Sequence, residues 1–271
     1  MAERLDVRKT YKLYAAGEFV RSESGRSYRA EGSNVPRASR KDLRDAVRAA
    51  RTAFPGWSRR TAMNRGQVLY RAAEMLDARR AQFAALLGGG RPAGREVDAA
   101  VDALVWYAGL TDKLVQLVGT VNPVAGPYFS FSIPEPTGVV GVVAPDEPAL
   151  LGLELGLAPV LCGGSTAVAL TSGPRPVAAL CLGEVLATSD LPAGAANLLS
   201  GFRSELLPWL ARHMDVNAID AAGCSPEELA AVEEAAAGSV KRVVRPGAGG
   251  HSPHRAAAFM ELKTVWHPVG V

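Results

Sequence analysis

The sequence predicts an α/β protein with an open, doubly wound parallel sheet, and three features of one central stretch support that fold class. Residues 139–144 form a near-continuous apolar run rich in valine, as expected for a parallel strand that is covered on both faces. Residues 148–161 carry leucines along a buried helix, which Gly163 and Gly164 end. A second strand follows at 166–170. This strand–helix–strand crossover predicts a Rossmann-like core.

Composition and charge narrow the class of protein. A chain of 271 residues with 48% hydrophobic residues can bury one large core or two modest ones. Its net charge of +3 is too small to predict nucleic-acid binding. Cys162, Cys181 and Cys224 lack CxxC spacing, which favours a reducing compartment. No apolar run has bilayer length, and no signal-peptide pattern follows Met1. We therefore expect a cytoplasmic protein with neither a nucleic acid nor a membrane as partner.

The first part of the chain reads as a hairpin followed by helices. Residues 11–20 predict a short β-hairpin, and residues 22–34 predict polar turns. A helix is expected from 39 to 50, because Ser39 is a suitable N-cap and apolar residues follow at helical spacing. One longer helix is predicted over 61–87 and another over 94–118, each with a single apolar stripe.

The second part of the chain repeats the alternation of strands and helices. Residues 126–133 alternate aromatic and small polar residues, which predicts a strand with one solvated face. Beyond residue 170, helices are predicted at 176–187, 204–213 and 226–237, and strands at 195–199, 216–219 and 241–244. The predicted parallel sheet therefore has about five strands.

Six segments occur in an order that resembles one enzyme family. They are YKLYAAGEFVRSESG, EVDAAVDALVWYAG, EPTGVVGVVAP, LAPVLCGGSTAVAL, LPAGAANLLSG and FMELKTVW. Together they resemble the amino-terminal part, the cofactor domain and the carboxy-terminal strand of the aldehyde dehydrogenase superfamily, whose members use NAD(P). The resemblance implies N-terminal helices at 36–119, a degenerate NAD-binding Rossmann-like domain at 137–255, and a small β oligomerisation element made from 1–35, 120–136 and 256–271.

The resemblance also implies that the catalytic lobe is absent. In the family, a lobe with the nucleophilic cysteine lies between the cofactor domain and the last strand. Here only seven residues separate Pro253 from Glu261. The family's general base belongs to a glutamate-leucine-glycine-glycine run, and its position falls on Gly247, which has no side chain to take a proton. An alternative is that the glycines of 246–253 form only a flexible loop.

Other functional positions of the family are changed as well. The asparagine that donates to the developing oxyanion becomes Glu147, an acceptor that would repel that charge. The ribose-binding lysine and glutamate correspond to Thr171 and Pro174. In the pyrophosphate turn, the first glycine is kept while the next two positions differ; these residues are Gly223, Cys224 and Glu228. A carboxylate at this helix start would compete with a phosphate. The resemblance thus implies a pseudoenzyme without catalytic residues and without a cofactor.

The cysteines and histidines are weaker candidates for catalytic or metal-binding residues. Cys224 precedes a helix N-terminus, a setting that lowers a thiol pKa, so a divergent enzyme would have Cys224 as its only candidate nucleophile. Only His213 lies near it in sequence. Cys162 and Cys181 are predicted core residues. His251 and His254 have a spacing compatible with metal binding but lack the further ligands of a closed site, so no metal is expected.

The last strand is the predicted interface. In the family it leaves its own subunit and extends the catalytic-lobe sheet of a neighbour. Here Met260, Leu262, Thr264 and Trp266 alternate with Glu261, Lys263 and Val265. Without an evident place in its own fold, such a strand is buried by a partner or promotes aggregation. An alternative is that it pairs with residues 126–133 or with the hairpin of the same subunit.

Two functions of different classes follow from these expectations. The first is a noncatalytic subunit that assembles with a full-length aldehyde dehydrogenase, and also with copies of itself, and supports the oligomeric structure. The second is a stand-alone nucleotide-binding module that senses NAD.

Overall fold

The computed structural model describes residues 9–247 and 249–270, and a seven-stranded mixed sheet runs through its centre. The strand order is β11-β10-β7-β8-β9-β1-β2. Five of these strands are parallel: β7 (Val139–Val143), β8 (Thr166–Leu170), β9 (Ala196–Leu199), β10 (Ala218–Asp220) and β11 (Arg242–Val244). The Rossmann-like core predicted from the sequence is confirmed.

The N-terminal hairpin extends this same sheet. Its strands β1 (Leu13–Ala15) and β2 (Glu18–Val20) pair with each other, and Tyr14 of β1 lies opposite Leu198 of β9 in an antiparallel pair. The expectation that residues 1–35 belong to the small β element is therefore wrong for the hairpin. Tyr14 is fully buried, and burying its ring against the sheet favours this position over a separate one.

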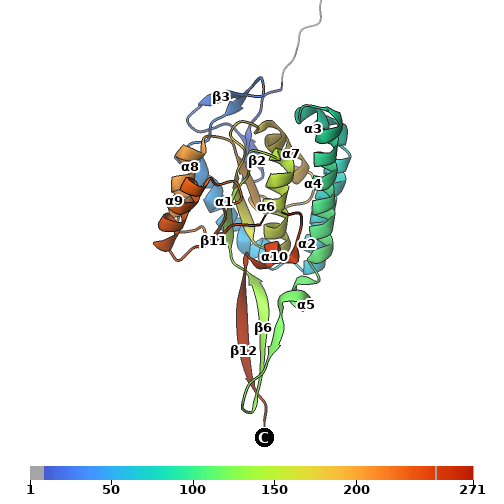
Figure 1. Ribbon diagram of the computed structural model, residues 1–271, viewed down its shortest axis with the longest axis vertical. Helices are drawn as coiled ribbons and strands as arrows, with labels where there is room; N and C mark the ends of the chain where they lie inside the picture. Colours follow the sequence, from blue (N-terminus) through green and yellow to red (C-terminus); the bar gives the residue numbers. More distant parts are fainter. Residues whose placement is uncertain (1–8, 248, 271) are drawn as a thin grey trace, which may run out of the picture.

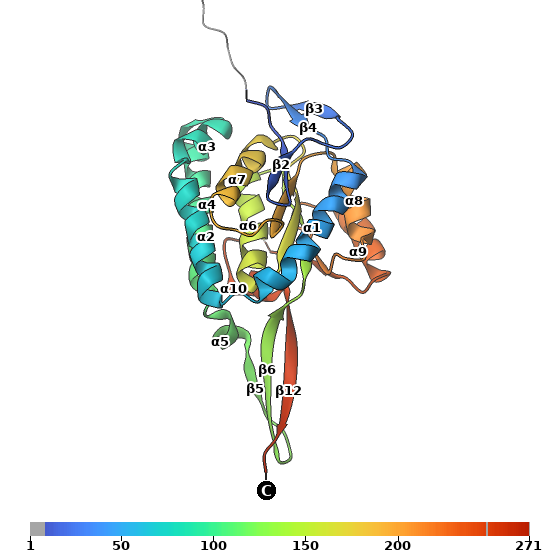
Figure 2. The same cartoon turned by 180° about the vertical axis from the view of Figure 1, so that it is seen from behind.

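Helices cover both faces of the central sheet, as Figures 1 and 2 show. Side chains alternate along β7, so that Val140 and Val142 face one layer while Val139 and Val143 face the other. The first layer holds α2 (Ala62–Asp77), α4 (Gly90–Leu110), α6 (Ala149–Gly163) and α7 (Val177–Ala187). The second holds α1 (Arg40–Ser58), α8 (Arg203–Arg212) and α9 (Pro226–Ala237).

Two predicted helices are each divided in the structure. The helix expected over 61–87 is α2 followed by α3 (Arg80–Leu86), which turns to pack on α4. The helix expected over 94–118 is α4 followed by α5 (Leu114–Val118); between them Thr111 Oγ1 donates to Ala108 O at 2.9 Å. The apolar stripe continues across both breaks, so periodicity alone did not reveal them.

The polar segment predicted as turns contains a second hairpin. Strands β3 (Ser27–Ala30) and β4 (Ser33–Pro36) form a two-stranded sheet. Its turn residues Glu31 and Gly32 both have positive φ. Ala30 and Val35 pack against Val177 and Leu180 of α7, and this small cluster anchors an otherwise polar hairpin. With so few apolar residues, the alternation that identifies strands is too weak to see in the sequence.

A three-stranded antiparallel sheet projects from the body, and we call it the arm (Figure 1). It consists of β5 (Thr120–Asn122), β6 (Tyr128–Pro136) and β12 (Met260–Pro268), with β6 in the middle. The short helix α10 (Pro253–Ala257) leads into β12, with only Ala258 and Phe259 between them. Segments 120–136 and 260–268, far apart in sequence, thus form one structural unit.

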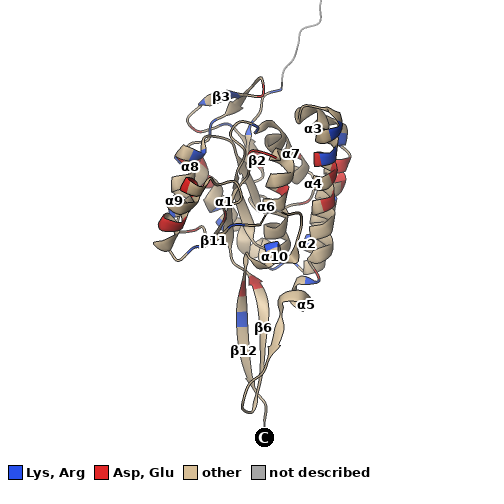
Figure 3. Cartoon of the chain, viewed as in Figure 1, with Lys and Arg blue, Asp and Glu red and all other residues tan. Residues whose placement is uncertain are grey.

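Charged side chains are sparse on the arm (Figure 3). They gather near its base, where Lys263 Nζ lies 2.5 Å from Glu135 and Arg242 lies 3.0 Å from Glu261. The sequence has no Lys, Arg, Asp or Glu in 120–134 or 264–270. Among the helices of the described ranges, none is both long enough and apolar enough to cross a lipid bilayer.

Candidate functional site

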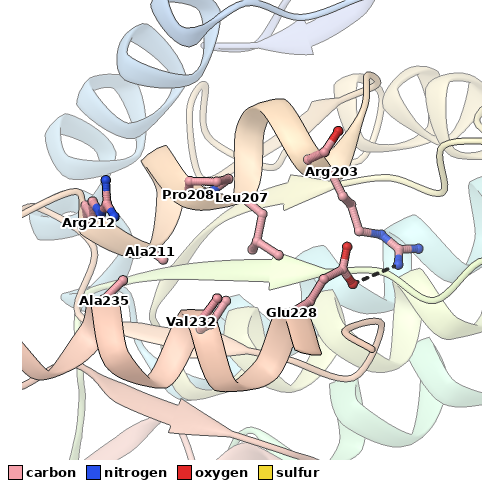
Figure 4. Close-up of a pocket in the computed structure, with 10 residues that line it drawn as sticks. Arg203, Leu207, Pro208, Ala211, Arg212, Glu228, Val232 and Ala235 are labelled. Carbon is pink, nitrogen blue, oxygen red and sulfur yellow. Dashed lines mark ion pairs between the residues drawn. The ribbon is translucent and has the colours of Figure 1, made fainter. Parts of the chain in front are cut away.

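The carboxyl ends of the parallel strands form a cleft, the usual place for a ligand in an open α/β sheet. The segments that follow β7, β9 and β10 meet there. One pocket, of about 210 Å³, lies between α8 and α9 and is shown in Figure 4. A second, of about 490 Å³, extends toward Tyr28 and Pro174. Both pockets share Arg203, Ser204 and Glu228.

Arg203 lines both pockets and lies where they meet. Its guanidinium donates to Gly223 O and to Asp146 Oδ1, each at 2.6 Å, and lies 3.6 Å from Glu228 Oε2 (Figure 4). Only 16% of the Arg203 side chain is exposed. Two carboxylates and a carbonyl of the same chain therefore already satisfy this cation. A cation in the first turn of a helix interacts unfavourably with the helix dipole. The position of Arg203 in α8 was therefore the one feature of the sequence that indicated an anionic partner for this side chain.

The N-terminus of α9 is capped by its own side chains. Ser225 Oγ accepts from the backbone N–H of Glu228 at 3.2 Å, and the Glu228 carboxylate accepts from the Ser225 N–H at 2.9 Å. This is a complete capping box. A second carboxylate, that of Glu227, lies 2.8 Å from Ser225 Oγ. Carboxylates of the chain itself therefore already lie at this helix start, the place where a helix otherwise attracts an anion.

Gly223 and Cys224, which lie just before α9, are both partly buried by neighbouring segments. A Cβ on Gly223 would lie 2.3 Å from Ala144 O, so only glycine allows this close approach to the end of β7. Burial, followed by the nearby Glu228 carboxylate, raises the pKa of the Cys224 thiol to about 11. Burial therefore opposes the lowering of the thiol pKa that a helix N-terminus can cause, and this favours the interpretation of Cys224 as a tolerated substitution over that of a nucleophile. His213 follows the far end of α8.

The other matched positions lie at the edge of the cleft. Glu147 is 75% exposed and pairs with Arg175 at 3.2 Å. Thr171 is buried at the end of β8, and Pro174 lines the larger pocket. The structure thus gathers Pro174, Gly223 and Glu228 around Arg203, and it leaves Glu147 outside that group.

Gly247 lies on an exposed loop where an added Cβ would meet nothing within 4 Å. Arg255 of α10 donates to Gly247 O at 2.9 Å. The interpretation of 246–253 as only a flexible loop is incomplete, because Ser252 caps α10 and its N–H donates to Tyr107 Oη at 3.2 Å. Residue 248 lies outside the described residues.

His251 and His254, which the sequence suggested as possible metal ligands, have different surroundings. The His251 ring packs on Trp106 with centroids 4.7 Å apart, and His254 is exposed on α10. In the part of the chain that the structure describes, no three His, Cys, Asp or Glu side chains gather as a metal site would require. Cys162 and Cys181 are buried, as predicted for core residues.

Glu154 is a further candidate for a functional residue, and the sequence analysis did not identify it. Glu154 of α6 is fully buried, and its Oε1 atom has no hydrogen-bond partner among the described residues. Burial raises the pKa of this carboxyl to about 8. Asp220 at the end of β10 is also buried, which raises the pKa of its carboxyl to about 6. A lone glutamate within a leucine-rich helix was the available signal.

The two faces of the arm carry different side chains, one with a ladder of polar groups beside exposed Leu262 and Trp266, and the other with a row of apolar residues. On the polar face, the hydroxyls of Ser132 and Thr264 share a hydrogen bond of 2.8 Å, and Asn122 donates to Ser132 at 2.9 Å. On the other, Val121 and Val265 lie on either side of Phe131 in one row across the three strands. We call this second surface the apolar face; its apolar residues are Val121, Phe129, Phe131, Ile133 and Val265, and β12 also places Lys263 and His267 on it.

These contacts change two expectations about the last strand. The first concerns its place in the fold: β12 pairs with β6 along its whole length, from Met260 opposite Pro136 to Pro268 opposite Tyr128. β12 therefore pairs within its own subunit, as the alternative prediction for the last strand stated. The second concerns its faces: the side with Met260, Leu262, Thr264 and Trp266 carries the polar ladder. β5 and β6 add apolar residues to the side of Val265, which a single strand could not reveal.

Comparisons with known proteins identify the relatives of this chain. A model described as the aldehyde dehydrogenase family matches residues 26–266. Retinal dehydrogenase 2 of Gallus gallus is 33% identical over 95% of this chain and 52% of its own length. A putative aldehyde dehydrogenase, DhaS, of Bacillus subtilis is 32% identical over 90% of this chain and 52% of its own length.

Solved structures give the same picture. An NAD+ complex of aldehyde dehydrogenase from Bacillus cereus superposes with a TM-score of 0.80 and 25% identity, covering 87% of this chain and 50% of that one. A putative aldehyde dehydrogenase from Burkholderia cenocepacia has a TM-score of 0.80 and 26% identity, over 86% of this chain and 51% of that one. The chain spans about half the length of the relatives it matches.

Proposed function

Because the chain belongs to the aldehyde dehydrogenase family, we propose that it is a noncatalytic subunit that assembles with a full-length aldehyde dehydrogenase and supports its oligomeric structure. The observation that carries this proposal is the arm: a projecting three-stranded sheet with a row of apolar side chains, Val121, Phe131 and Val265, on one face. Val121 is 69% exposed. An exposed apolar surface on a projecting element is typical of a protein–protein contact.

The cleft supports the noncatalytic part of the proposal. The general-base position is Gly247, which cannot take a proton, and the oxyanion position is Glu147, which would repel an oxyanion. Between α10 and β12 the chain has only two residues, so a catalytic lobe is not inserted there. Arg203 and Glu228 already satisfy each other's charges at the cleft. We propose on this basis that the subunit neither oxidises an aldehyde nor holds NAD(P) in the manner of its relatives.

The test is co-purification with the full-length aldehyde dehydrogenase of the native source, followed by light scattering. We expect a mixed complex that Val121→Lys weakens about tenfold or more, because a lysine on the apolar face must lose its hydration. Thr120→Lys is the matched control: the residue is adjacent and exposed but belongs to the opposite face. Absence of a mixed complex, or equal weakening by both variants, would contradict the proposal.

A nucleotide-sensing module is the second candidate, and the open pocket between α8 and α9 favours it. Leu207 and Val232 give this pocket apolar walls that could hold a planar base. Calorimetry with NAD and NADP distinguishes the two functions. Micromolar binding supports the sensing module, whereas the noncatalytic-subunit proposal expects no measurable heat.

A further inference from the structure

The outer edge of β12 is a long, unpaired strand edge. In the sheet order β12-β6-β5, β6 is the strand that pairs with β12 among the described residues. Near the body, Arg242 donates to Met260 O at 2.7 Å and pairs with Glu261. Beyond them, alternate residues of the nine-residue strand Met260–Pro268 direct backbone groups to the outer side, and no other strand pairs with these groups in the described part of the chain. Proteins normally shorten, cover or charge such an edge, because it offers a template for another strand. Lys263 is the one cation on β12, and Glu135 already pairs with it.

The sequence of β12 is complementary to itself in one antiparallel register. When a twofold axis passes beside Thr264, Leu262 lies opposite Trp266 of the second copy, so that two apolar side chains meet. In the same register every residue of β12 lies opposite a residue of the second β12, because Thr264 is the middle residue of Met260–Pro268. A twofold axis perpendicular to the sheet requires paired residues of the same parity, and these pairs satisfy that condition.

The neighbouring registers are less favourable. An axis beside Lys263 would place that cation opposite its own copy, and like charges directly opposite each other destabilise a strand pair. An axis beside Val265 would separate Leu262 from Trp266, because these residues would then lie opposite Pro268 and Thr264. An axis beside Leu262 would pair Glu261 with Lys263 but would leave residues 265–268 without partners in β12. Apolar matching over the whole strand therefore selects the axis at Thr264.

We propose that, without a full-length enzyme, this chain forms a homodimer in which the two β12 edges pair antiparallel about Thr264. The two arms then form one continuous sheet with three strands from each copy. Only the short β5 strands, of three residues each, remain at its edges. This inference rests on the arm being an assembly surface, as in the proposed function, and it names the occupant of the β12 edge.

Engineered cysteines test both the dimer and its register. In the proposed dimer the two copies of residue 264 lie directly opposite, where Cβ atoms in antiparallel pairs are about 4.5–5.5 Å apart. Thr264→Cys should therefore form an intermolecular disulfide under mild oxidation. Val265→Cys is the matched control: its opposite residue is Lys263, and its own copy lies about 7–8 Å away diagonally. The double variant Lys263→Cys/Val265→Cys should again form the disulfide.

The expected result is a dimer by light scattering and a rate of disulfide formation at least tenfold higher for Thr264→Cys than for Val265→Cys. The wild-type chain, treated identically, controls for Cys162, Cys181 and Cys224. A monomer at high protein concentration, equal rates for the two variants, or faster formation at Val265→Cys would each overturn the inference. Thermal unfolding of each variant shows whether the arm and body stay folded.

The two proposals fail in different ways. If a mixed complex with the full-length enzyme forms but Thr264→Cys does not give a disulfide, only the homodimer is wrong. If the disulfide forms and no mixed complex appears, the homodimer stands and the proposed function is wrong.

Discussion

Arg203 donates to Asp146 Oδ1 at 2.6 Å across the cleft, and this contact joins the segment after β7 to the start of α8. The same guanidinium bonds to Gly223 O at the end of the β10 segment. One half-buried side chain thus links three segments at the edge of the sheet where open α/β folds bind their ligands.

Replacing this arginine should destabilise the protein. Arg203→Ala removes two charge-assisted hydrogen bonds and leaves Asp146 and Glu228 without their shared cation, at a cost of about 2–3 kcal/mol in unfolding free energy. Urea denaturation measures the change. Arg212→Ala is the control, because Arg212 lines the same pocket but is exposed, and its removal should change the stability by less than about 0.5 kcal/mol. Equal effects would contradict a specific role for Arg203.

The capping box of α9 gives a second prediction. Ser225→Ala removes the hydroxyl that accepts from the Glu228 N–H, and N-cap losses of this kind cost about 1 kcal/mol. Ser204→Ala, at an exposed position in the first turn of α8 that is not an N-cap, should have almost no effect. Chemical denaturation of both variants tests this, and the prediction is wrong if they lose the same stability.

Glu154 should make stability depend on pH. In the folded protein the carboxyl of Glu154 has a pKa of about 8 and keeps its proton up to that pH, whereas in the unfolded chain it has its ordinary pKa of 4.5. Stability is therefore expected to fall as pH rises from about 4.5 to 8, by up to about 1.4 kcal/mol per pH unit. Asp220, with a pKa of about 6, acts in the same direction at the lower end of that range.

A single substitution isolates the Glu154 effect. Glu154→Gln cannot ionise, so the fall in stability between pH 6 and 8 should disappear from denaturation curves recorded at several pH values. Glu233→Gln, on the exposed surface of α9, should leave that fall in place. A Glu154→Gln protein with an unchanged pH profile would show that the buried carboxyl does not control it.

Cys224 should react slowly with alkylating reagents near neutral pH. With a pKa of about 11, only a very small fraction of its thiol is ionised at pH 7.5, and the thiolate is the reactive form. Labelling by iodoacetamide, followed by mass spectrometry, should accelerate about tenfold per pH unit. Glu228→Gln removes a neighbouring negative charge and should speed the reaction. Labelling of the wild type as fast as a free cysteine would revive Cys224 as a nucleophile.

Local patterns in the sequence predicted most elements of the body. The valine run of β7, the glycine end of α6 and the Ser225 N-cap of α9 each depend on residues within one element, so the fold class follows from them. The breaks at Thr111 and after Asp77 depend instead on packing against α4 and neighbouring segments, and an uninterrupted apolar stripe conceals them. The β3–β4 hairpin was missed because only three of its residues, Ala30, Val35 and Pro36, are buried.

The sequence by itself determined the family, the order of strands and helices, and the residue types at the matched positions Glu147, Gly247 and Glu228. Only the tertiary structure decided that Arg203 meets Asp146, 57 residues away, and that β12 pairs with β6 to give the arm an apolar face. The physical reason is range: helix and strand patterns arise from neighbouring residues, whereas ion pairs and strand registers are set by folding that brings distant segments together.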